Sequence, residues 1–188
     1  VSSLMEYSDF KSRGIILEIK KAINRVERTI KATLLFSKEH QNLKLNDISL
    51  SSLFKEIEEV CEYYSYSKDI KFIFDIPDIN IYADFELSLI LFQNLVFNAI
   101  DAIEEGKSEN GEIKVSYRDN NDFHIFSVSD TGIDIKDKKS LFDAFKTTKL
   151  NGNGIGLNLA KKIAIAHQGD IKLDEDHKMF YVAYRKNK

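Results

Sequence analysis

Three short motifs hold the residues of this sequence that are best suited to chemistry. They are 94–102 (NLVFNAIDA), 130–134 (DTGID) and 152–157 (GNGIGL), in this order along the chain. Their residue types suit a metal ion, a flat base and phosphate groups, respectively. Each motif alone also has a simpler structural explanation.

The first motif places three polar side chains on one face of an otherwise apolar helix. Asn94, Asn98 and Asp101 are spaced i, i+4 and i+7, so they form one polar stripe. An asparagine oxygen suits a hydrated Mg²⁺ without adding negative charge beside phosphates. The alternative is a stripe that faces bulk water, and the helix alone does not decide between the two.

The second motif follows a strand of alternating apolar and polar residues. The carboxylate of Asp130, at the strand end, can accept a hydrogen bond from an exocyclic amine such as that of adenine. Gly132 allows the backbone to approach a flat ring closely. Taken alone, an ordinary Asp-Thr-Gly turn is the simpler explanation.

The third motif is a run of alternating glycines that leads into a helix. Gly152, Gly154 and Gly156 can point successive N–H groups into one concavity, and the helix adds its positive N-terminus. This arrangement predicts a phosphate-binding loop. It is neither the dinucleotide fingerprint GxGxxG nor a Walker A loop.

The composition limits the classes of partner. The 188 residues are 43% hydrophobic and 30% charged, which is typical of a soluble globular protein. A net charge of −3 gives no sign of a nucleic-acid or membrane partner. No apolar run reaches the roughly 18 residues of a membrane span. The single cysteine, Cys61, is expected to be a buried thiol in a reducing, cytoplasmic setting.

A long helix is expected over residues 12–38. Its apolar residues follow 3-4-3-4 spacing, which favours a helical dimerisation bundle over a helix packed on its own domain. The seam consists of Ile16, Ile19, Ile23, Val26 and Ile30. The polar stretch 38–47 reads as a hinge after this helix. Because the chain begins with Val1, we expect it to be a fragment, with an anchor or sensor upstream.

The remainder predicts an α+β sandwich, with helices packed on one face of a mixed sheet. Ser49 or Ser51 is expected to cap a helix that runs to about residue 66, and Asp84 a second helix to about 104. The other predicted elements are strands at 71–76, 80–83, 113–117, 123–129, 170–173 and 179–184, a loop-rich region at 131–153, and a helix at 155–167.

With these elements in order, the sequence from about 33 to 184 resembles the GHKL ATPases, and among them the two-component sensor histidine kinases. The three motifs are similar to the N, G1 and G2 boxes of that family. Residues 141–149 (LFDAFKTTK) resemble the F box and lid, and the Thr-Thr-Lys ending is similar to nitrogen-regulatory and flagellar-regulatory kinases. Residues 34–38 look like the end of a dimerisation helix, and 167–171 match the start of the last hairpin.

The resemblance implies a fold and a domain division. The fold would be a two-layer α/β sandwich of the Bergerat type, preceded by a long helix from a dimerisation bundle. Residues 1–46 would be the second helix of a partial dimerisation domain, and residues 47–188 the ATP-binding catalytic domain.

It also implies roles for single residues. Asn98 would bind Mg²⁺ and Asn94 would lie near the phosphates, while Asp130 would bind adenine N6 and Gly132 would line its pocket. The remaining ATP-binding residues would be Lys149, Gly152, Gly154, Gly156 and Leu157, with Phe142 and Phe145 as lid anchors. The two phenylalanines could equally be plain core, and Lys149 a solvated lysine.

The sequence departs from the family at Asp134, where the G1 box usually has glycine. Aspartate adds a Cβ and a negative charge near the lid, and it tolerates positive φ less well than glycine. We expect weaker ATP binding or a stiffer lid. Asp134→Gly should therefore tighten ATP binding, and an unchanged affinity would contradict this explanation.

A second departure is that no phospho-acceptor motif of the family occurs. The histidines are expected to be structural or solvated; they are His40, His124, His167 and His177. The chain alone should therefore bind ATP without autophosphorylation.

The function implied is an ATP- and Mg²⁺-dependent protein-histidine kinase. It would transfer the γ-phosphoryl group to a histidine outside this chain, and thence to an aspartate of a response regulator. The Thr-Thr-Lys sequence favours a regulator that is a transcriptional activator of the nitrogen or flagellar type. The full protein would form a homodimer through its helical bundle, without nucleic-acid contact and without membrane contact by this segment. The alternatives are a degenerate module that acts as a binding scaffold and a serine kinase of the anti-sigma type.

Overall fold

A computed structural model describes most of the chain. The described residues are 43–187, except 69, 107–109, 136–137, 139 and 144–153, together with three positions nearer the N-terminus. The chain divides into two compact units, Val1–Gln41 and Asn42–Lys188. In the first unit, Ile23, Val26 and Ile30 are helical and more than half exposed, as a seam without a partner would be. The rest of the predicted helix 12–38, including 34–38, lies outside the described residues.

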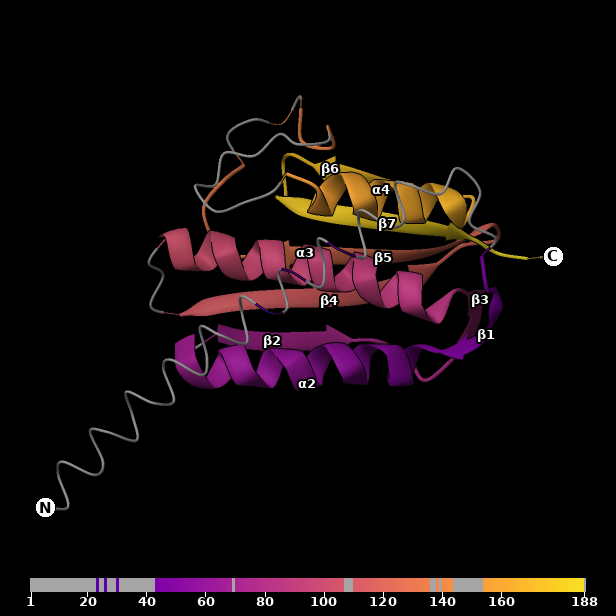
Figure 1. Cartoon of the computed structure of the whole chain (residues 1–188), viewed down its shortest axis with the longest axis horizontal. Coiled ribbons are helices and arrows are strands. Elements are labelled where there is room, and N and C mark those ends of the chain that lie inside the picture. Colours follow the sequence, from indigo (N-terminus) through magenta and orange to yellow (C-terminus); the bar gives the residue numbers. More distant parts are fainter. Residues whose placement is uncertain are drawn as a thin grey trace, which may run out of the picture. The chain divides into compact units, whose positions relative to one another are not determined.

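The second unit is a two-layer sandwich of helices on a sheet (Figure 1). The five-stranded sheet has the order β2-β4-β5-β7-β6, and its strands are β2 (Ile70–Asp75), β4 (Gly111–Asp119), β5 (Phe123–Asp130), β7 (Met179–Arg185) and β6 (Asp170–Asp174). β2 and β4 are parallel and the other pairs are antiparallel. Three helices cover one face, namely α2 (Leu50–Lys68), α3 (Phe85–Gly106) and α4 (Gly156–Ala166). The predicted α+β fold with a mixed sheet is confirmed.

Side-chain caps set the starts of α2 and α3. The Ser49 hydroxyl accepts a hydrogen bond from the Ser52 N–H at 3.2 Å, and the Asp84 carboxylate accepts one from the Leu87 N–H at 3.1 Å. Each cap satisfies a backbone donor that the helix leaves unpaired. Of the two serines considered for α2, the structure selects Ser49.

One strand was missed by the sequence analysis. β1 (Asn46–Ser49) pairs antiparallel with β3 (Asn80–Ala83), whereas the sequence analysis read 38–47 as a hinge. Ile48 is the only apolar residue of β1 and is buried, while Asn46 and Asp47 are exposed. This segment is a strand because its backbone pairs with β3. No local sequence pattern predicts that pairing.

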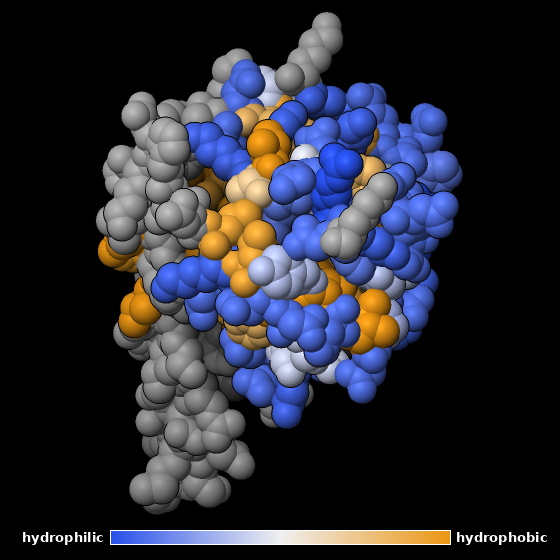
Figure 2. Space-filling model, turned by 90° about the vertical axis from the view of Figure 1, so that its right-hand side faces the viewer, coloured by the Kyte–Doolittle hydropathy of each residue, from blue (hydrophilic) through white to orange (hydrophobic). Residues whose placement is uncertain are grey.

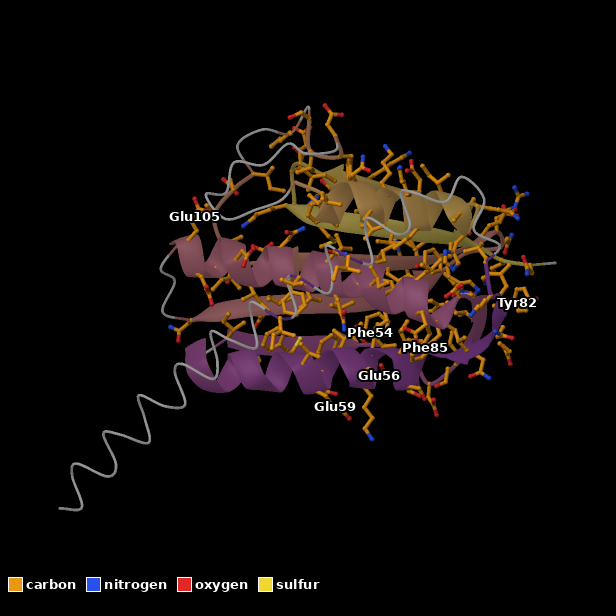
Figure 3. All side chains as sticks on the ribbon, in the orientation of Figure 1. Phe54, Glu56, Glu59, Tyr82, Phe85 and Glu105 are labelled. Atoms are coloured by element: carbon orange, nitrogen blue, oxygen red, sulfur yellow. The ribbon has the colours of Figure 1, made fainter. Side chains whose placement is uncertain are left out.

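An aromatic cluster holds the helices on the sheet. Phe92 of α3 lies between Phe54 of α2 and Phe126 of β5, with ring centroids 4.9 and 4.8 Å away. Figure 3 shows Phe54 directed toward the sheet, while Glu56 and Glu59 of the same helix point away from it. This alternation follows the helical period, and the buried rings supply much of the apolar area removed from water.

The face seen in Figure 2 is largely hydrophilic, with small scattered hydrophobic spots. Among the described residues one helix, Phe85–Gly106, is long and apolar enough to span a membrane, but 67% of its apolar window is buried inside the domain. It is therefore the core helix of the sandwich.

A buried polar network fixes the start of α3 against the end of α4. The His167 ring accepts a hydrogen bond from the Asp84 N–H at Nε2, 3.0 Å away, and its Nδ1 lies 2.8 Å from the Ile163 carbonyl oxygen. The carbonyl can only accept, so Nδ1 carries the proton and the ring is neutral. Tyr184 of β7 stacks on the ring at 4.2 Å and donates to the Ser88 hydroxyl.

Candidate functional site

The candidate site lies at one end of the sandwich, on the left in Figure 1. Four pieces of chain meet there: the C-terminal half of α3, the end of β5, the start of α4 and the turn at 175–178 between β6 and β7. They bring together residues of the three motifs that are more than 50 positions apart in the sequence.

The polar stripe of α3 runs from buried to exposed. Asn94 is buried and donates from Nδ2 to the Ile90 carbonyl oxygen at 2.8 Å. Asn98 is half-buried and makes no hydrogen bond with any residue that the structure describes, while Asp101 is exposed. Only the last of the three thus faces open solvent, and Asn94 and Asn98 lie toward the neighbouring elements.

The start of α4 packs against this stripe. A Cβ on Gly156 would lie 2.9 Å from Oδ1 of Asn94, so only glycine allows the present approach. Gly154 has a φ of 61°, the left-handed region that glycine adopts without strain. No side chain of the described residues caps α4, and its first turn holds no acidic residue. The first N–H groups of α4 are therefore available to an anion beside Asn94.

The second motif docks directly on α3. A Cβ on Gly132 would fall 2.3 Å from the Ala102 carbonyl carbon, and the Ile133 N–H donates to the Ala102 oxygen at 3.1 Å. The Thr131 hydroxyl accepts from the Glu112 N–H at 2.9 Å. These contacts hold Asp130 at a fixed place beside the C-terminal half of α3.

Asp130 has a partner that the sequence analysis did not identify. Its Oδ1 accepts hydrogen bonds from the Gly132 N–H at 2.8 Å and from the Lys178 ammonium at 2.9 Å. Lys178 also donates to the Gly132 carbonyl oxygen. The two residues are 48 positions apart, and only the pairing of β5 with β7 brings them together. No local pattern could have revealed this contact.

Phe142, which the sequence analysis predicts as a lid anchor, is held on three sides. Phe142 packs edge-on against Phe180, and Lys161 of α4 lies over its ring, 4.9 Å from the centroid. The Asn158 Nδ2 donates to the Phe142 carbonyl oxygen at 2.6 Å, a contact that the sequence analysis did not predict. Phe142 therefore fastens the described segment around it to α4.

Three predicted site residues lie outside the described residues, namely Phe145, Lys149 and Gly152. Leu157 is half-buried in the first turn of α4. Asp134 is exposed, and the described non-glycine residues with positive φ are Gln168 and Lys178. Backbone strain therefore does not contribute to the weaker ATP binding expected of Asp134. The negative charge of its side chain is the remaining reason for that expectation.

The residues present fit a magnesium ion shared with phosphates. The described part of the chain holds no group of three or more His, Cys, Asp or Glu side chains that could bind a metal on its own. Mg²⁺ keeps several waters and usually takes one or two protein oxygens together with substrate phosphates. Asn98 offers such an oxygen, one helical turn from the Asn94–Gly156 contact.

The described histidines and the cysteine have structural surroundings. Burial lowers the pKa of His124, whose Nδ1 lies 2.8 Å from the Tyr117 hydroxyl. His177 is exposed and lies 3.0 Å from Asp174, while His167 belongs to the buried network. Cys61 is buried, and burial raises the pKa of its thiol to about 12, so it is inert.

Comparison with known proteins gives consistent matches. Residues 86–185 match the family described as histidine kinase-, DNA gyrase B-, and HSP90-like ATPase. The sensor histidine kinase FlgS of Helicobacter pylori is 43% identical over 176 residues, which are 93% of this chain and 46% of that protein. The chain thus spans less than half the length of this relative.

Two similar solved structures belong to histidine kinase ThkA. Its nucleotide-free catalytic domain has a TM-score of 0.67 and 30% identity, covering 77% of this chain and 97% of that one. ThkA in complex with the response regulator protein TrrA has a TM-score of 0.69 and 28% identity, covering 90% of this chain and 49% of that one.

Proposed function

Because the chain belongs to the family of histidine kinase-, DNA gyrase B- and HSP90-like ATPases, we propose that it is the ATP-binding catalytic domain of a two-component sensor histidine kinase. It transfers the γ-phosphoryl group of ATP to a histidine outside this chain, and the phosphoryl group then passes to an aspartate of a response regulator. The similarity to FlgS over 93% of the chain supports this assignment.

One observation carries the proposal: a single helix, α3, supports both ends of a nucleotide-sized site. Near Ala102 it holds the segment of Asp130 and Gly132, and at Asn94 it meets Gly156 at the start of α4. The positions are eight residues apart, or about 12 Å along a helix. This separation suits a base at one end and phosphates at the other.

The proposed roles follow from these positions. Asp130 accepts a hydrogen bond from the adenine amine. Gly132, whose missing Cβ lets this segment pack on the backbone of α3, lines the base pocket. The N–H groups at the start of α4, with Gly152, Gly154 and Gly156, bind the phosphates. Leu157, in the first turn of α4, is the last residue of this phosphate-binding segment. Lys149 contacts the phosphates from the lid, and Phe142 and Phe145 anchor that lid.

Asn98 is the proposed protein ligand of Mg²⁺, with Asn94 near the phosphates. Bound Mg²⁺ neutralises charge that develops on the phosphoryl oxygens. The protein's own contribution is to orient the γ-phosphoryl group and to present fixed N–H dipoles to it, as is usual in phosphoryl transfer. The sequence holds no phospho-acceptor motif of the family, so the proposed acceptor lies outside this chain.

The proposed partners and location follow from the relatives. ThkA has been solved with a response regulator, and we assign this chain a regulator partner, of the nitrogen or flagellar type suggested by the lid sequence. The exposed Ile23, Val26 and Ile30 suit a helical bundle that forms the homodimer. The domain would act on the cytoplasmic side of the membrane.

Isothermal titration with ATP and Mg²⁺ tests the proposal. We expect binding by the wild-type chain and at least about tenfold weaker binding by Asn98→Ala, because a metal ligand is lost. Asn121→Ala is the matched control, since Asn121 is exposed in the turn before β5, at the opposite end of that strand from Asp130. It should bind ATP like the wild type.

Absence of binding at millimolar ATP would instead support the degenerate scaffold. If ATP binds, supplying a histidine-bearing dimerisation helix in trans should give phosphohistidine, which is acid-labile. Acid-stable phosphoserine would support the anti-sigma type of kinase.

A further inference from the structure

The contact between Lys178 and Asp130 is more enclosed than the pairs Lys71–Glu112 and Lys186–Asp119. The side chains of Lys178 and Asp130 are 19% and 12% exposed, against 70% and 40% for the pair Lys71–Glu112. An exposed pair of the latter kind contributes little to stability or function. At 19% exposure the Lys178 ammonium has restricted access to water, so protein or ligand acceptors matter for its donors.

The hydrogen bonds leave one donor and one acceptor free. An ammonium group has three N–H donors, and the contacts of Lys178 with Asp130 Oδ1 and the Gly132 oxygen use two. Asp130 Oδ1 takes two donors, while Oδ2 accepts no hydrogen bond from any residue that the structure describes. The ammonium group and the carboxylate, whose Nζ and Oδ1 lie 2.9 Å apart, therefore each keep one group for a ligand, an N–H and Oδ2.

This pair matches the edge of adenine that carries the exocyclic amine. The amine is a donor, and the adjacent ring nitrogen N1 is an acceptor. We propose that Lys178 is a second base-reading residue, whose ammonium donates to N1 while Asp130 accepts from the amine. The inference rests on the proposed function, since it requires the base to lie at Asp130. Guanine presents the acceptor O6 and the donor N1–H at this edge. It would therefore place an acceptor against the Asp130 carboxylate and a donor against the Lys178 ammonium.

The backbone at Lys178 favours this role over a chance contact. Its φ is 48°, in the left-handed region that glycine adopts freely and lysine does not. The residue with this uncommon conformation is the one whose side chain reaches Asp130. Lys172 of β6 offers a contrast, because it is exposed and no described contact ties it to the site.

The test removes the hydrogen bond from each side in turn. The probes are ATP and 1-deaza-ATP, in which a C–H group replaces N1, titrated with Mg²⁺ into the wild-type chain and into Lys178→Met. We expect 1-deaza-ATP to bind the wild type about tenfold or more weakly than ATP, as for loss of a hydrogen bond to a charged group. Lys178→Met should bind ATP with a similar loss and should no longer distinguish the two nucleotides. Lys172→Met, the matched control, should behave like the wild type.

Three results would overturn the inference in distinguishable ways. Equal binding of both nucleotides to the wild type would show that nothing donates to N1, and this readout needs no folded variant. Tighter ATP binding by Lys178→Met would show that the lysine competes with the amine for Asp130. Failure of the wild type to bind ATP at all would refute the proposed function itself.

Discussion

At the scale of single residues, His167 makes the stability of the domain depend on pH. Burial lowers its pKa, and the hydrogen bonds to Asp84 and Ile163 need the neutral ring. The unfolded chain binds a proton below about pH 6.5, whereas the folded protein resists it. The stabilisation from His167 is therefore complete above about pH 6.5 and is lost as the pH falls toward the lowered pKa of the folded state.

Urea unfolding of the wild type and of His167→Gln, from pH 5 to pH 8, measures this effect. The wild type should lose free energy of unfolding below about pH 6.5, and the variant should lose less of it. The pKa of His124 is also lowered, but its contribution stays in both proteins and cancels in the difference. Parallel curves for the two proteins would contradict the assignment to His167.

At the scale of elements, the end of α4 can be improved. The Gln168 N–H donates to Ile165 and the Gly169 N–H to Ala164, which is a Schellman motif with Gln168 at a φ of 55°. Gln168→Gly should raise the free energy of unfolding by about 0.5 to 1 kcal/mol, because glycine has no Cβ to clash in this conformation. Thermal unfolding measures the change.

At the neighbouring Gly169, a substitution is expected to lower the stability of the protein. A Cβ on Gly169 would fall 1.7 Å from the Ala183 carbonyl oxygen of β7. Gly169→Ala should therefore destabilise the protein by about 1 to 3 kcal/mol, as overpacking does.

A loss of stability in Gln168→Gly would show that the glutamine side chain matters more than its backbone conformation.

At the scale of the whole molecule, Phe92 joins the two layers. It contacts aromatic rings of α2, β5 and β7, so Phe92→Ala should lower the free energy of unfolding by about 3 to 5 kcal/mol. Ile165→Ala is the control, because Ile165 is 55% exposed on α4 and its loss should cost little. Denaturant unfolding of both variants checks the difference.

Much of the fold was predictable because its signals are local. Alternation marked β4 and β5, and Asp84 and Ser49 marked the helix starts. β1 was missed because Ile48 is its one buried apolar residue. In the site, the sequence motifs identified Asn94, Asp130 and Gly156 as candidates, but no motif pointed to Lys178. Its contact depends on strand pairing across 48 residues and on a positive φ that the sequence does not signal.

The way the segment between Ile133 and Gly154 joins the domain has a consequence for evolution. On one side, the Ile133 N–H is bound to Ala102 of α3, and on the other, Gly156 is seated on Asn94 of the same helix. With both ends held by one rigid element, doubling the length of the intervening loop costs only about 0.6 kcal/mol in closure entropy. Segments of other lengths and sequences can therefore be exchanged on this scaffold, and selection can vary this part of the chain while the rest of the domain stays the same.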